Sequence, residues 1–418
     1  MELRRLDKSE HSKTRNLWEC VFDEDSKEFL DYYYFFKTRD NEIYVIEEDE
    51  DVRSMLHLNP YTIQVGEEQF IGHYIIAVAT ESAYRRRGYM GKILKKSMQD
   101  MYSRKELFTF LMPAAESIYT PYDFRFVYDQ NVWTYTIEDE QIALEKPESE
   151  LAENPFTRAR IKGLGNKEAA CVVSDAGIGD GKLLAEFFNT YFAEKFQVYA
   201  VRDEGYYQIM LFEQQSENGG IRLLEKDSKV VGTFLYSDED GLEIREPLYL
   251  KEYEMDFWNA VRSLCTERGQ SCAAVYADID KSNEGVKSTI MVRIIHLENL
   301  LKAIKAKEGE EIDCSFAVLD SILPQNSRVW KLKSKALEFT QMQEQEEGTE
   351  VVTAEDLLVR ETEDSEGVLT IAALTSLLFG YKSVEEVAEE PDVYLTEHLV
   401  EELRKIQTLN AVYLNEIV

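Results

Sequence analysis

Between His73 and Met101 the chain carries its most informative pattern. An apolar strand to Ala79 is followed by the three arginines 85–87, by Gly88, and by a helix with apolar residues at helical spacing. A helix start exposes unpaired backbone N–H groups and the positive end of the helix dipole, and glycine lets a ligand approach closely. This layout favours phosphate or pyrophosphate binding. A solvated arginine turn is the alternative, and this stretch alone leaves both open.

The length and charge of the chain limit its architecture and its partners. At 418 residues, with 44% hydrophobic and 30% charged side chains, it is expected to form two or three globular domains. The balance of 47 basic against 80 acidic residues gives a net charge of −33. This charge argues against a nucleic-acid partner and favours either simple solubility or a cationic ligand.

Cysteine and histidine usage predicts a cytoplasmic protein without a metal. The five cysteines lack CxxC spacing, and the five histidines form no HxH or HExxH pattern. The N-terminus has no apolar signal core, and no run of 18 apolar residues occurs. No membrane partner is therefore expected.

Helix and strand patterns alternate along the chain, which predicts an α/β fold with mixed (α+β) sheets. A charged segment with two prolines, 141–155, is expected to be a linker. The expected strands are 43–47, 52–58, 61–65, 73–79, 107–112, 206–212, 220–225, 229–236, 291–295, 315–320, 328–332 and 336–341. The expected helices are 17–22, 28–36, 182–196, 253–268, 297–306, 371–379 and a last one carrying Leu399, Leu403 and Ile406. The apolar end, 411–418, is expected to be buried, because chain ends are otherwise polar and frayed.

Three features together resemble one protein family. They are the strand, RRRG turn and amphipathic helix; the segment LMPAAESIYTPYDFRFVYD at 111–129; and the ending YLNEIV. The combination resembles the Eis-type (enhanced intracellular survival) branch of the GNAT N-acetyltransferases. The resemblance implies a GNAT domain at 1–145, a second, degenerate GNAT-like domain at 146–288, and a sterol-carrier-protein-like domain at 289–418. It also implies a homo-hexamer.

The resemblance implies that acetyl-CoA is held by backbone groups of the fourth strand and of the arginine-glycine loop. The corresponding residues are Val78, Ala79, Thr80, Arg86, Arg87, Gly88, Tyr89, Met90, Gly91, Ala114 and Ala115. The superfamily loop commonly has a small residue where this chain has Met90. Because backbone amides do the binding, the assignment is kept.

Two catalytic groups are carried over from the family. Tyr119 would protonate the departing CoA thiolate as general acid, and the C-terminal carboxylate of Val418 would act as base. A tyrosine packed in the core is the alternative for Tyr119. A free carboxylate has a pKa of about 3.5, so Val418 needs desolvation or a relaying water to accept the proton of an ammonium group.

The family acetylates amines, which suggests an aminoglycoside-like or polyamine acceptor, or a protein lysine. Asp23, Glu24 and Glu416 fall where the family lines its amine pocket, with Tyr34 or Phe35 as an aromatic wall. For each acidic residue, a solvated surface position is the alternative. An alternative function is a non-catalytic protein that binds a lipid or apolar ligand and keeps a vestigial acetyltransferase domain.

Overall fold

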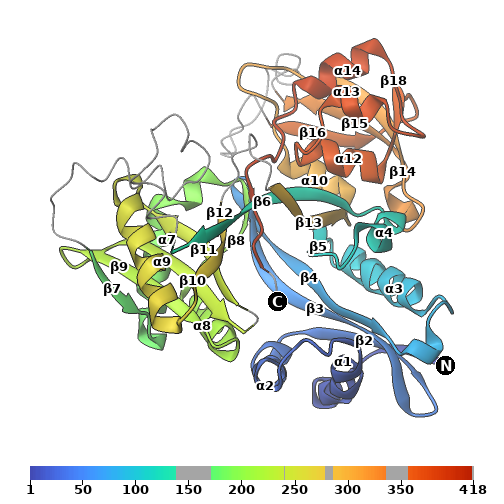
Figure 1. Cartoon of the computed structure of the whole chain (residues 1–418). Helices are drawn as coiled ribbons and strands as arrows, with labels where there is room; N and C mark the ends of the chain where they lie inside the picture. Colours follow the sequence, from blue (N-terminus) through green and yellow to red (C-terminus); the bar gives the residue numbers. More distant parts are fainter. Residues whose placement is uncertain (138–170, 240, 278–285, 336–355, 417–418) are drawn as a thin grey trace, which may run out of the picture.

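The computed structural model of the chain describes residues 1–137, 171–239, 241–277, 286–335 and 356–416. These residues form a mixed α/β fold built on two sheets (Figure 1). The predicted fold class is confirmed. The predicted linker at 141–155 and the predicted strand at 336–341 lie outside the described residues.

The first domain is a sheet with helices on both faces (Figure 1). Its strands are β1 (Glu2–Arg5), β2 (Glu42–Glu48), β3 (Asp51–Val65), β4 (Glu68–Thr80), β5 (Phe108–Leu111) and β6 (Arg125–Thr136). Its helices are α1 (Arg15–Val21), α2 (Lys27–Phe35), α3 (Tyr89–Ser103) and α4 (Glu116–Tyr119). In β2, Ile43 and Val45 pack with α1 and α2, whereas Tyr44 and Ile46 pack with α3. Both faces are covered, which explains why this strand is a continuous apolar run.

β3 is one long strand, so the prediction of separate strands at 52–58 and 61–65 was wrong. Pro60, which lies between the two predicted strands, pairs with His73 within the β3–β4 ladder. On the other edge of β3, β2 pairs only as far as Leu58, and β8 (Val198–Ala200) pairs from Ile63 onward. Pro60 therefore lies where this edge has no strand partner, and there a proline costs the sheet little.

The described residues of the second domain form three α-helices and six strands. Its strands are β7 (Val172–Asp175), β8, β9 (Gly220–Lys226), β10 (Lys229–Asp238), β11 (Leu242–Tyr249) and β12 (Cys272–Ala277). Its helices are α7 (Gly181–Tyr191), α8 (Glu204–Ser216) and α9 (Glu254–Arg268). The prediction of a strand at 206–212 was wrong: this segment is inside α8. The side chain of Asp203 caps that helix by accepting a hydrogen bond from the N–H of Tyr206 at 2.7 Å.

The sheets of the first two domains are continuous through β6. One part of β6 pairs with β13 (Val286–Ile294) and the remainder with β12. β13 also pairs with β5, so it lies inside the sheet of the first domain. β13 thus spans the boundary predicted between residues 288 and 289. The three-domain boundaries remain a prediction.

The third domain has a five-stranded sheet, ordered β16-β15-β14-β17-β18. Its strands are β14 (Asp313–Leu319), β15 (Val329–Ser334), β16 (Leu357–Glu361), β17 (Gly367–Thr370) and β18 (Tyr394–Leu395). Its helices are α10 (Leu297–Ala303), α12 (Ile371–Leu378), α13 (Val384–Ala388) and α14 (Glu397–Arg404). α12 is buried along its whole length, and the ring of the following Phe379 packs against that of Phe108 on β5. The sheet of the first domain therefore covers apolar surface of α12 and of Phe379.

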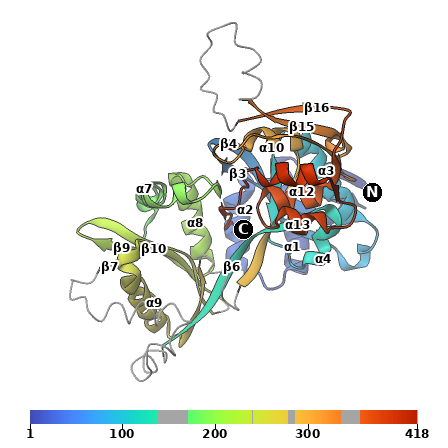
Figure 2. The ribbon, with the colours of Figure 1, turned by 90° about the horizontal axis from the view of Figure 1, so that it is seen from above.

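The end of the chain returns to the other two domains. β19 (Val412–Tyr413) pairs in parallel with β8, which in turn pairs with β3. Residues 412–416 are all buried, so the predicted burial of the apolar end is confirmed for this part. Seen from above, the C-terminal end lies between the second domain and the other two domains (Figure 2).

Candidate active site

A V-shaped opening forms where β4 and β5 part. The two parallel strands pair only at His73–Thr109 and Tyr74–Phe110. Just beyond, β4 bulges at Ala77, which has a positive φ of 52°. A bulge bends its strand and disrupts the ladder locally. The last residues of β4, Val78 to Thr80, are thus left with backbone groups facing an opening rather than β5.

The arginine-glycine loop closes one end of this opening. Arg86 and Gly88 both have left-handed backbone conformations, with φ of 62° and 77°. When left-handed residues alternate with residues of ordinary conformation, successive backbone N–H groups point to the same side and form a concave anion-binding site. Lys92 makes the first helical hydrogen bond, to the carbonyl of Gly88 at 3.1 Å, so the N–H groups of the preceding residues of α3 have no helical acceptor.

The opening continues into a cleft of about 650 Å³. All the residues predicted to hold acetyl-CoA line it except Arg87 and Ala115. Arg87 instead donates a hydrogen bond to the carbonyl of Ala83 at 3.1 Å and stacks on the ring of Tyr84. The Arg87 side chain therefore contacts the residues just before the loop rather than the cleft.

Tyr119 lies at the end of α4 and lines the same cleft. It is 7% exposed, and its ring contacts that of Phe124 edge-on, with 5.8 Å between ring centroids. Burial raises the pKa of Tyr119 to about 12. The hydroxyl thus stays protonated at neutral pH and is available as a proton donor.

Tyr122, three residues later, packs against the start of α3. A Cβ added at Gly91 would lie 2.6 Å from the hydroxyl oxygen of Tyr122. Only glycine allows this approach without a shift of the ring. The turn after Tyr119 and the arginine-glycine loop are therefore in direct contact.

A second cavity, of about 550 Å³, lies between the first and second domains. Its lining includes Lys37 from the short 3-10 helix after α2, Tyr61 from β3, and Tyr206 and Glu213 from α8. The Lys37 ammonium donates to the hydroxyl of Tyr61 at 2.9 Å and lies 3.8 Å from the Glu213 carboxylate. Burial lowers the pKa of Lys37 and raises that of Glu213.

A smaller cavity of about 60 Å³ adjoins the second cavity and has more acidic than basic side chains. The two cavities share Met210 and Glu213, and the smaller one is also lined by Glu217, Glu246 and Arg245. Burial raises the pKa of Glu217 to about 7. One carboxylate oxygen of Glu246 has no hydrogen-bond partner among the described residues. These are acceptor groups, which suit a cationic guest.

The C-terminal segment lies behind the lining of the second cavity, where Glu416 contacts the lining residue Tyr206. The Glu416 side chain is 1% exposed; it accepts a hydrogen bond from the hydroxyl of Tyr206 at 3.0 Å and lies 3.7 Å from the guanidinium of Arg202. Burial raises the pKa of Glu416. Val418, the predicted base, lies outside the described residues.

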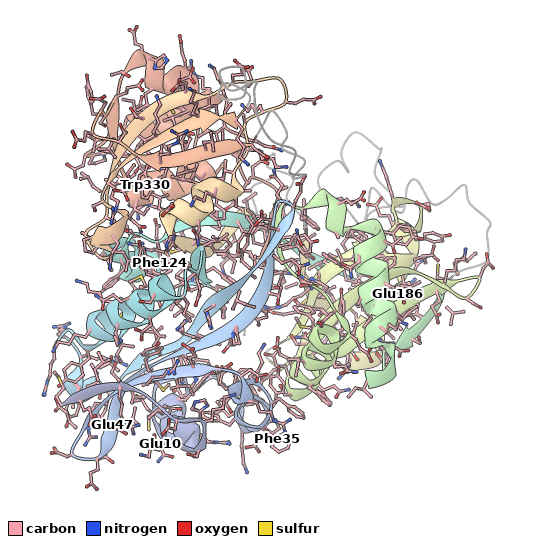
Figure 3. All side chains as sticks on the ribbon, turned by 180° about the vertical axis from the view of Figure 1, so that it is seen from behind. Glu10, Phe35, Glu47, Phe124, Glu186 and Trp330 are labelled. Carbon is pink, nitrogen blue, oxygen red and sulfur yellow. The ribbon has the colours of Figure 1, made fainter. Side chains whose placement is uncertain are left out.

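The other residues predicted to bind the acceptor line neither the cleft nor the second cavity. Asp23 and Glu24 are exposed in the turn after α1, although Val21 and Phe22 just before them line the cleft. The Tyr34 hydroxyl hydrogen-bonds that of Thr14 at 2.8 Å, and Phe35 is 61% exposed on the surface (Figure 3). Their role in acceptor binding stays a prediction.

Sequence reasoning missed several cavity residues. Lys37, Tyr61, Tyr206 and Glu213 come from three elements of two domains, and no spacing in the sequence links them. Tyr122 carried a usable signal, because it follows Tyr119 by three residues and therefore shares its turn. Its partner Gly91 becomes evident only in three dimensions.

The splayed strands, the anion-binding loop and the cleft together form the layout of a GNAT acetyltransferase domain. Residues 2–127 match the family model of the acetyltransferase (GNAT) domain, and residues 297–415 match that of the sterol carrier protein domain. The protein is therefore an N-acetyltransferase with a sterol carrier protein domain at its C-terminal end. This is the combination that the sequence predicts, and it is confirmed.

Solved structures of the same fold span the whole chain. They include a probable N-acyltransferase from Enterococcus faecalis (TM-score 0.74, 16% identity, covering 100% of this chain and 99% of the other). A GCN5-related N-acetyltransferase from Anabaena variabilis has a TM-score of 0.74 and 15% identity, and Eis1 from Mycobacterium abscessus 0.65 and 12%, each covering 100% of both chains. No curated protein matched the sequence.

Two further observations concern membranes and metals. None of the helices in the described part of the chain combines the length and apolarity needed to cross a bilayer. Within the same residues, no group of three or more histidine, cysteine, aspartate or glutamate side chains is arranged to hold a metal ion.

Proposed function

We propose that the protein transfers an acetyl group from acetyl-CoA directly to a primary amine of a polycationic acceptor, in a ternary complex. The observation that carries this proposal is the single cleft that combines the β4 backbone, the arginine-glycine loop and Tyr119. Direct transfer needs only that the amine and the thioester carbonyl be held together in a water-poor site.

The proposed acetyl donor is acetyl-CoA, because residues 2–127 match a GNAT domain and GNAT domains use acetyl-CoA. The N–H groups at the start of α3 and the left-handed loop residues would hold the pyrophosphate. Backbone N–H groups near Val78 would polarise the thioester carbonyl. When bound, acetyl-CoA supplies an activated acetyl group, and the protein supplies orientation and proton donors.

Tyr119 is proposed as the general acid. Its raised pKa keeps the phenol protonated, and its position in the cleft supports donation to a departing thiolate. The C-terminal carboxylate of Val418 is proposed as the base that accepts the ammonium proton. The burial of residues 412–416 supports this role, because a desolvated carboxylate has a higher pKa and is a better base.

The second cavity is proposed to take the acceptor. The excess of carboxylates in the second cavity and the smaller cavity beside it supports an acceptor with more than one ammonium group, such as an aminoglycoside-like molecule or a polyamine. A protein lysine is the third candidate. Cytoplasmic location and a homo-hexamer belong to the same proposal and rest on the family resemblance.

The alternative, an apolar-ligand carrier with a vestigial first domain, has less support. α12, the most apolar helix of the third domain, is fully buried and packs on β6, β13 and the ring of Phe108. Its surface is therefore already covered by protein.

A thiol-release assay tests the proposed function. Purified protein, acetyl-CoA and a panel of aminoglycosides and polyamines should release CoA only when an amine acceptor is present, and Tyr119→Phe should slow the release. If no CoA is released in the presence of any acceptor, and calorimetry detects no binding of acetyl-CoA, the proposed acetyl transfer is excluded and the non-catalytic carrier is favoured.

A further inference from the structure

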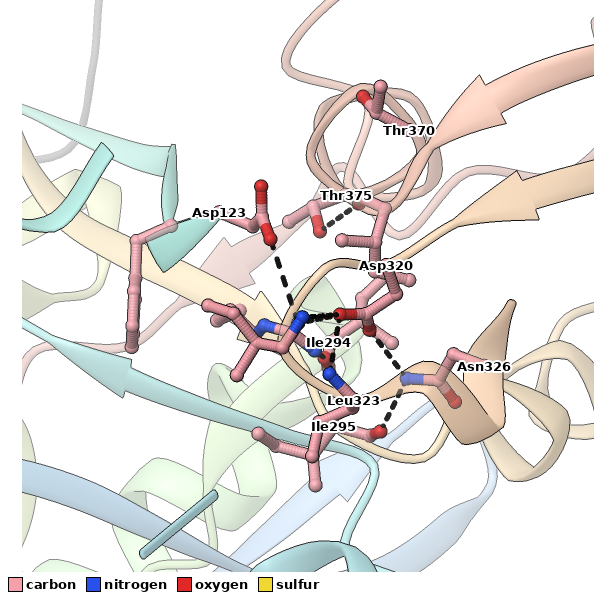
Figure 4. A network of polar contacts seen from close by, with 12 residues as sticks. Asp123, Ile294, Ile295, Asp320, Leu323, Asn326, Thr370 and Thr375 are labelled. Atoms are coloured by element: carbon pink, nitrogen blue, oxygen red, sulfur yellow. Dashed lines mark hydrogen bonds and ion pairs between the residues drawn. The ribbon is translucent and has the colours of Figure 1, made fainter. Parts of the chain in front are cut away.

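The turn that carries Tyr119 is held from two sides. On one side Tyr122 packs against Gly91 at the start of α3. On the other side Asp123 faces β13 and the third domain (Figure 4). Phe124, which contacts the Tyr119 ring, is fully buried where the first and third domains meet (Figure 3). The position of the phenol therefore depends on both contacts.

Asp123 closes the turn. It has a left-handed conformation, with φ of 66°, and its N–H donates to the carbonyl of Thr120 at 3.1 Å. The next N–H, of Phe124, donates to the carbonyl of Tyr119 itself at 3.4 Å. A displacement of Asp123 would thus be transmitted through the backbone to Tyr119.

The carboxylate of Asp123 faces a buried arginine. One oxygen of Asp123 lies 3.7 Å from the guanidinium of Arg293, whose side chain is 0% exposed. The same guanidinium nitrogen lies 2.6 Å from Asp320, which follows β14 of the third domain. Arg293 therefore joins the turn of Tyr119 to the third domain through two carboxylates. Figure 4 shows these two carboxylates, Asp123 and Asp320, with their contacts as dashed lines.

Asp320 is rigidly placed. Its carboxylate accepts hydrogen bonds from the N–H groups of Ile322 and Leu323, at 3.0 and 2.8 Å, and from the amide of Asn326 at 2.9 Å. Asn326 also donates to the carbonyl of Ile295 at 2.9 Å. A carboxylate with this many donors is a fixed anchor, so Arg293 has little freedom to move away from Asp123.

We propose that Asp123 and Arg293 are positioning residues that hold the Tyr119 turn against the sterol carrier protein domain. The sterol carrier protein domain thereby contributes to the position of Tyr119, because its Asp320 anchors Arg293. The proposal rests on the proposed function, since it assumes that Tyr119 donates the proton.

Asp123→Asn is the informative variant. Asparagine has the same shape and tolerates a left-handed backbone, and Arg293 keeps its partner Asp320, so the fold should be retained. We expect kcat to fall about tenfold and the KM for acetyl-CoA to change by less than about twofold, because a small displacement of the acid slows chemistry without weakening the pyrophosphate contacts.

Asp129→Asn is the matched control. Asp129 on β6 also contacts the third domain, by accepting a hydrogen bond from the hydroxyl of Tyr381 at 2.8 Å, but it is outside the turn. Its substitution should leave kcat unchanged. An equal loss of kcat in both variants would show general loosening between the domains and would overturn the proposal.

The double variant Tyr119→Phe/Asp123→Asn separates this proposal from the proposed function. If Asp123 acts through the phenol, its substitution should have no further effect once the phenol is removed. An additional tenfold loss in the double variant, or unchanged kcat in Asp123→Asn alone, would refute positioning. Full activity of Tyr119→Phe would instead refute the acid role itself.

Discussion

At the residue scale, the chemistry depends on side chains whose surroundings change their acidity. Tyr119 is buried against Phe124 yet borders the cleft, so its phenol is desolvated and remains protonated. Glu213 and Glu416 have raised pKa values for the same physical reason. Burial therefore keeps the proton on the Tyr119 phenol, and it shifts the pKa values of the two carboxyl groups in the same direction.

The raised pKa of Tyr119 predicts the alkaline side of the pH profile. Because the phenol is protonated below about pH 12, kcat should not decline between about pH 7 and pH 10. Steady-state rates over this range check the prediction, with circular dichroism confirming that the fold persists. A fall in kcat across this range that disappears in Tyr119→Phe would contradict it.

The contact between Gly91 and Tyr122 predicts a rescue experiment. Gly91→Ala places a methyl group against the Tyr122 hydroxyl, and strain of about 1 kcal/mol should raise the KM for acetyl-CoA about fivefold. Removing the hydroxyl in Gly91→Ala/Tyr122→Phe should restore the original KM, and Tyr122→Phe alone should have little effect. Persistence of the defect in the double variant would refute this explanation.

Single residues of the cleft were predictable where they lie in one continuous motif. The arginine-glycine loop and the Tyr119 turn are local patterns, and the structure brings them to one cleft. Lys37 and Tyr206 were not predictable, because tertiary packing alone brings them together. Asp23 and Glu24 were chosen by analogy, and the turn that holds them is exposed.

At the element scale, the C-terminal strand is the least expected feature. β19 pairs with β8 although the two strands are far apart in the sequence. Just before the strands, the N–H of Ala411 donates a hydrogen bond to the side-chain oxygen of Gln197 at 3.1 Å, across 214 residues of sequence. The apolar ending indicated burial, but the strand partner could not be inferred, because pairing depends on the arrangement of two other domains.

This arrangement predicts that the position of the terminal carboxylate matters. Adding one residue after Val418 should lower turnover at least about a hundredfold, because it moves the proposed base. β19 and the Glu416 contacts are retained, so the melting temperature should stay the same. Unchanged turnover in the extended protein would exclude the carboxylate as base.

Most elements followed from apolar periodicity, and the exceptions have physical causes. Tyr206 to Phe212 is rich in aromatic residues and was taken as a strand, but Tyr207, Met210 and Leu211 are buried at helical spacing. The capping box of Ser383 and Glu386 shows the contrasting case, because both of its hydrogen bonds are local and depend on no tertiary contact.

At the scale of the whole molecule, buried charges tie the three domains together. Arg202, next to β8, pairs with Glu246 of β11 at 2.6 Å and approaches Glu416 of the terminal segment, and all three side chains are buried. Arg293 plays a similar role between the first and third domains. Neither arrangement could be deduced from the sequence, since arginine is usually a surface residue.

The Arg202 cluster predicts a large stability effect. Arg202→Met leaves two carboxylates buried without their partner and should lower the free energy of unfolding by about 3 kcal/mol. Arg328→Met is the control, because the Arg328–Glu361 pair is exposed and should contribute at most about 1 kcal/mol. Denaturant unfolding checks both, and equal losses would contradict the importance given to burial.

A single-turnover experiment tests direct transfer of the acetyl group from acetyl-CoA to the amine within one ternary complex. With acetyl-CoA labelled in its acetyl group and a polyamine acceptor, the label should move to the amine at the same rate as CoA is released, while the protein stays unlabelled in mass spectrometry. Accumulation of acetylated protein before product, or CoA release without any acetylated amine, would contradict the account.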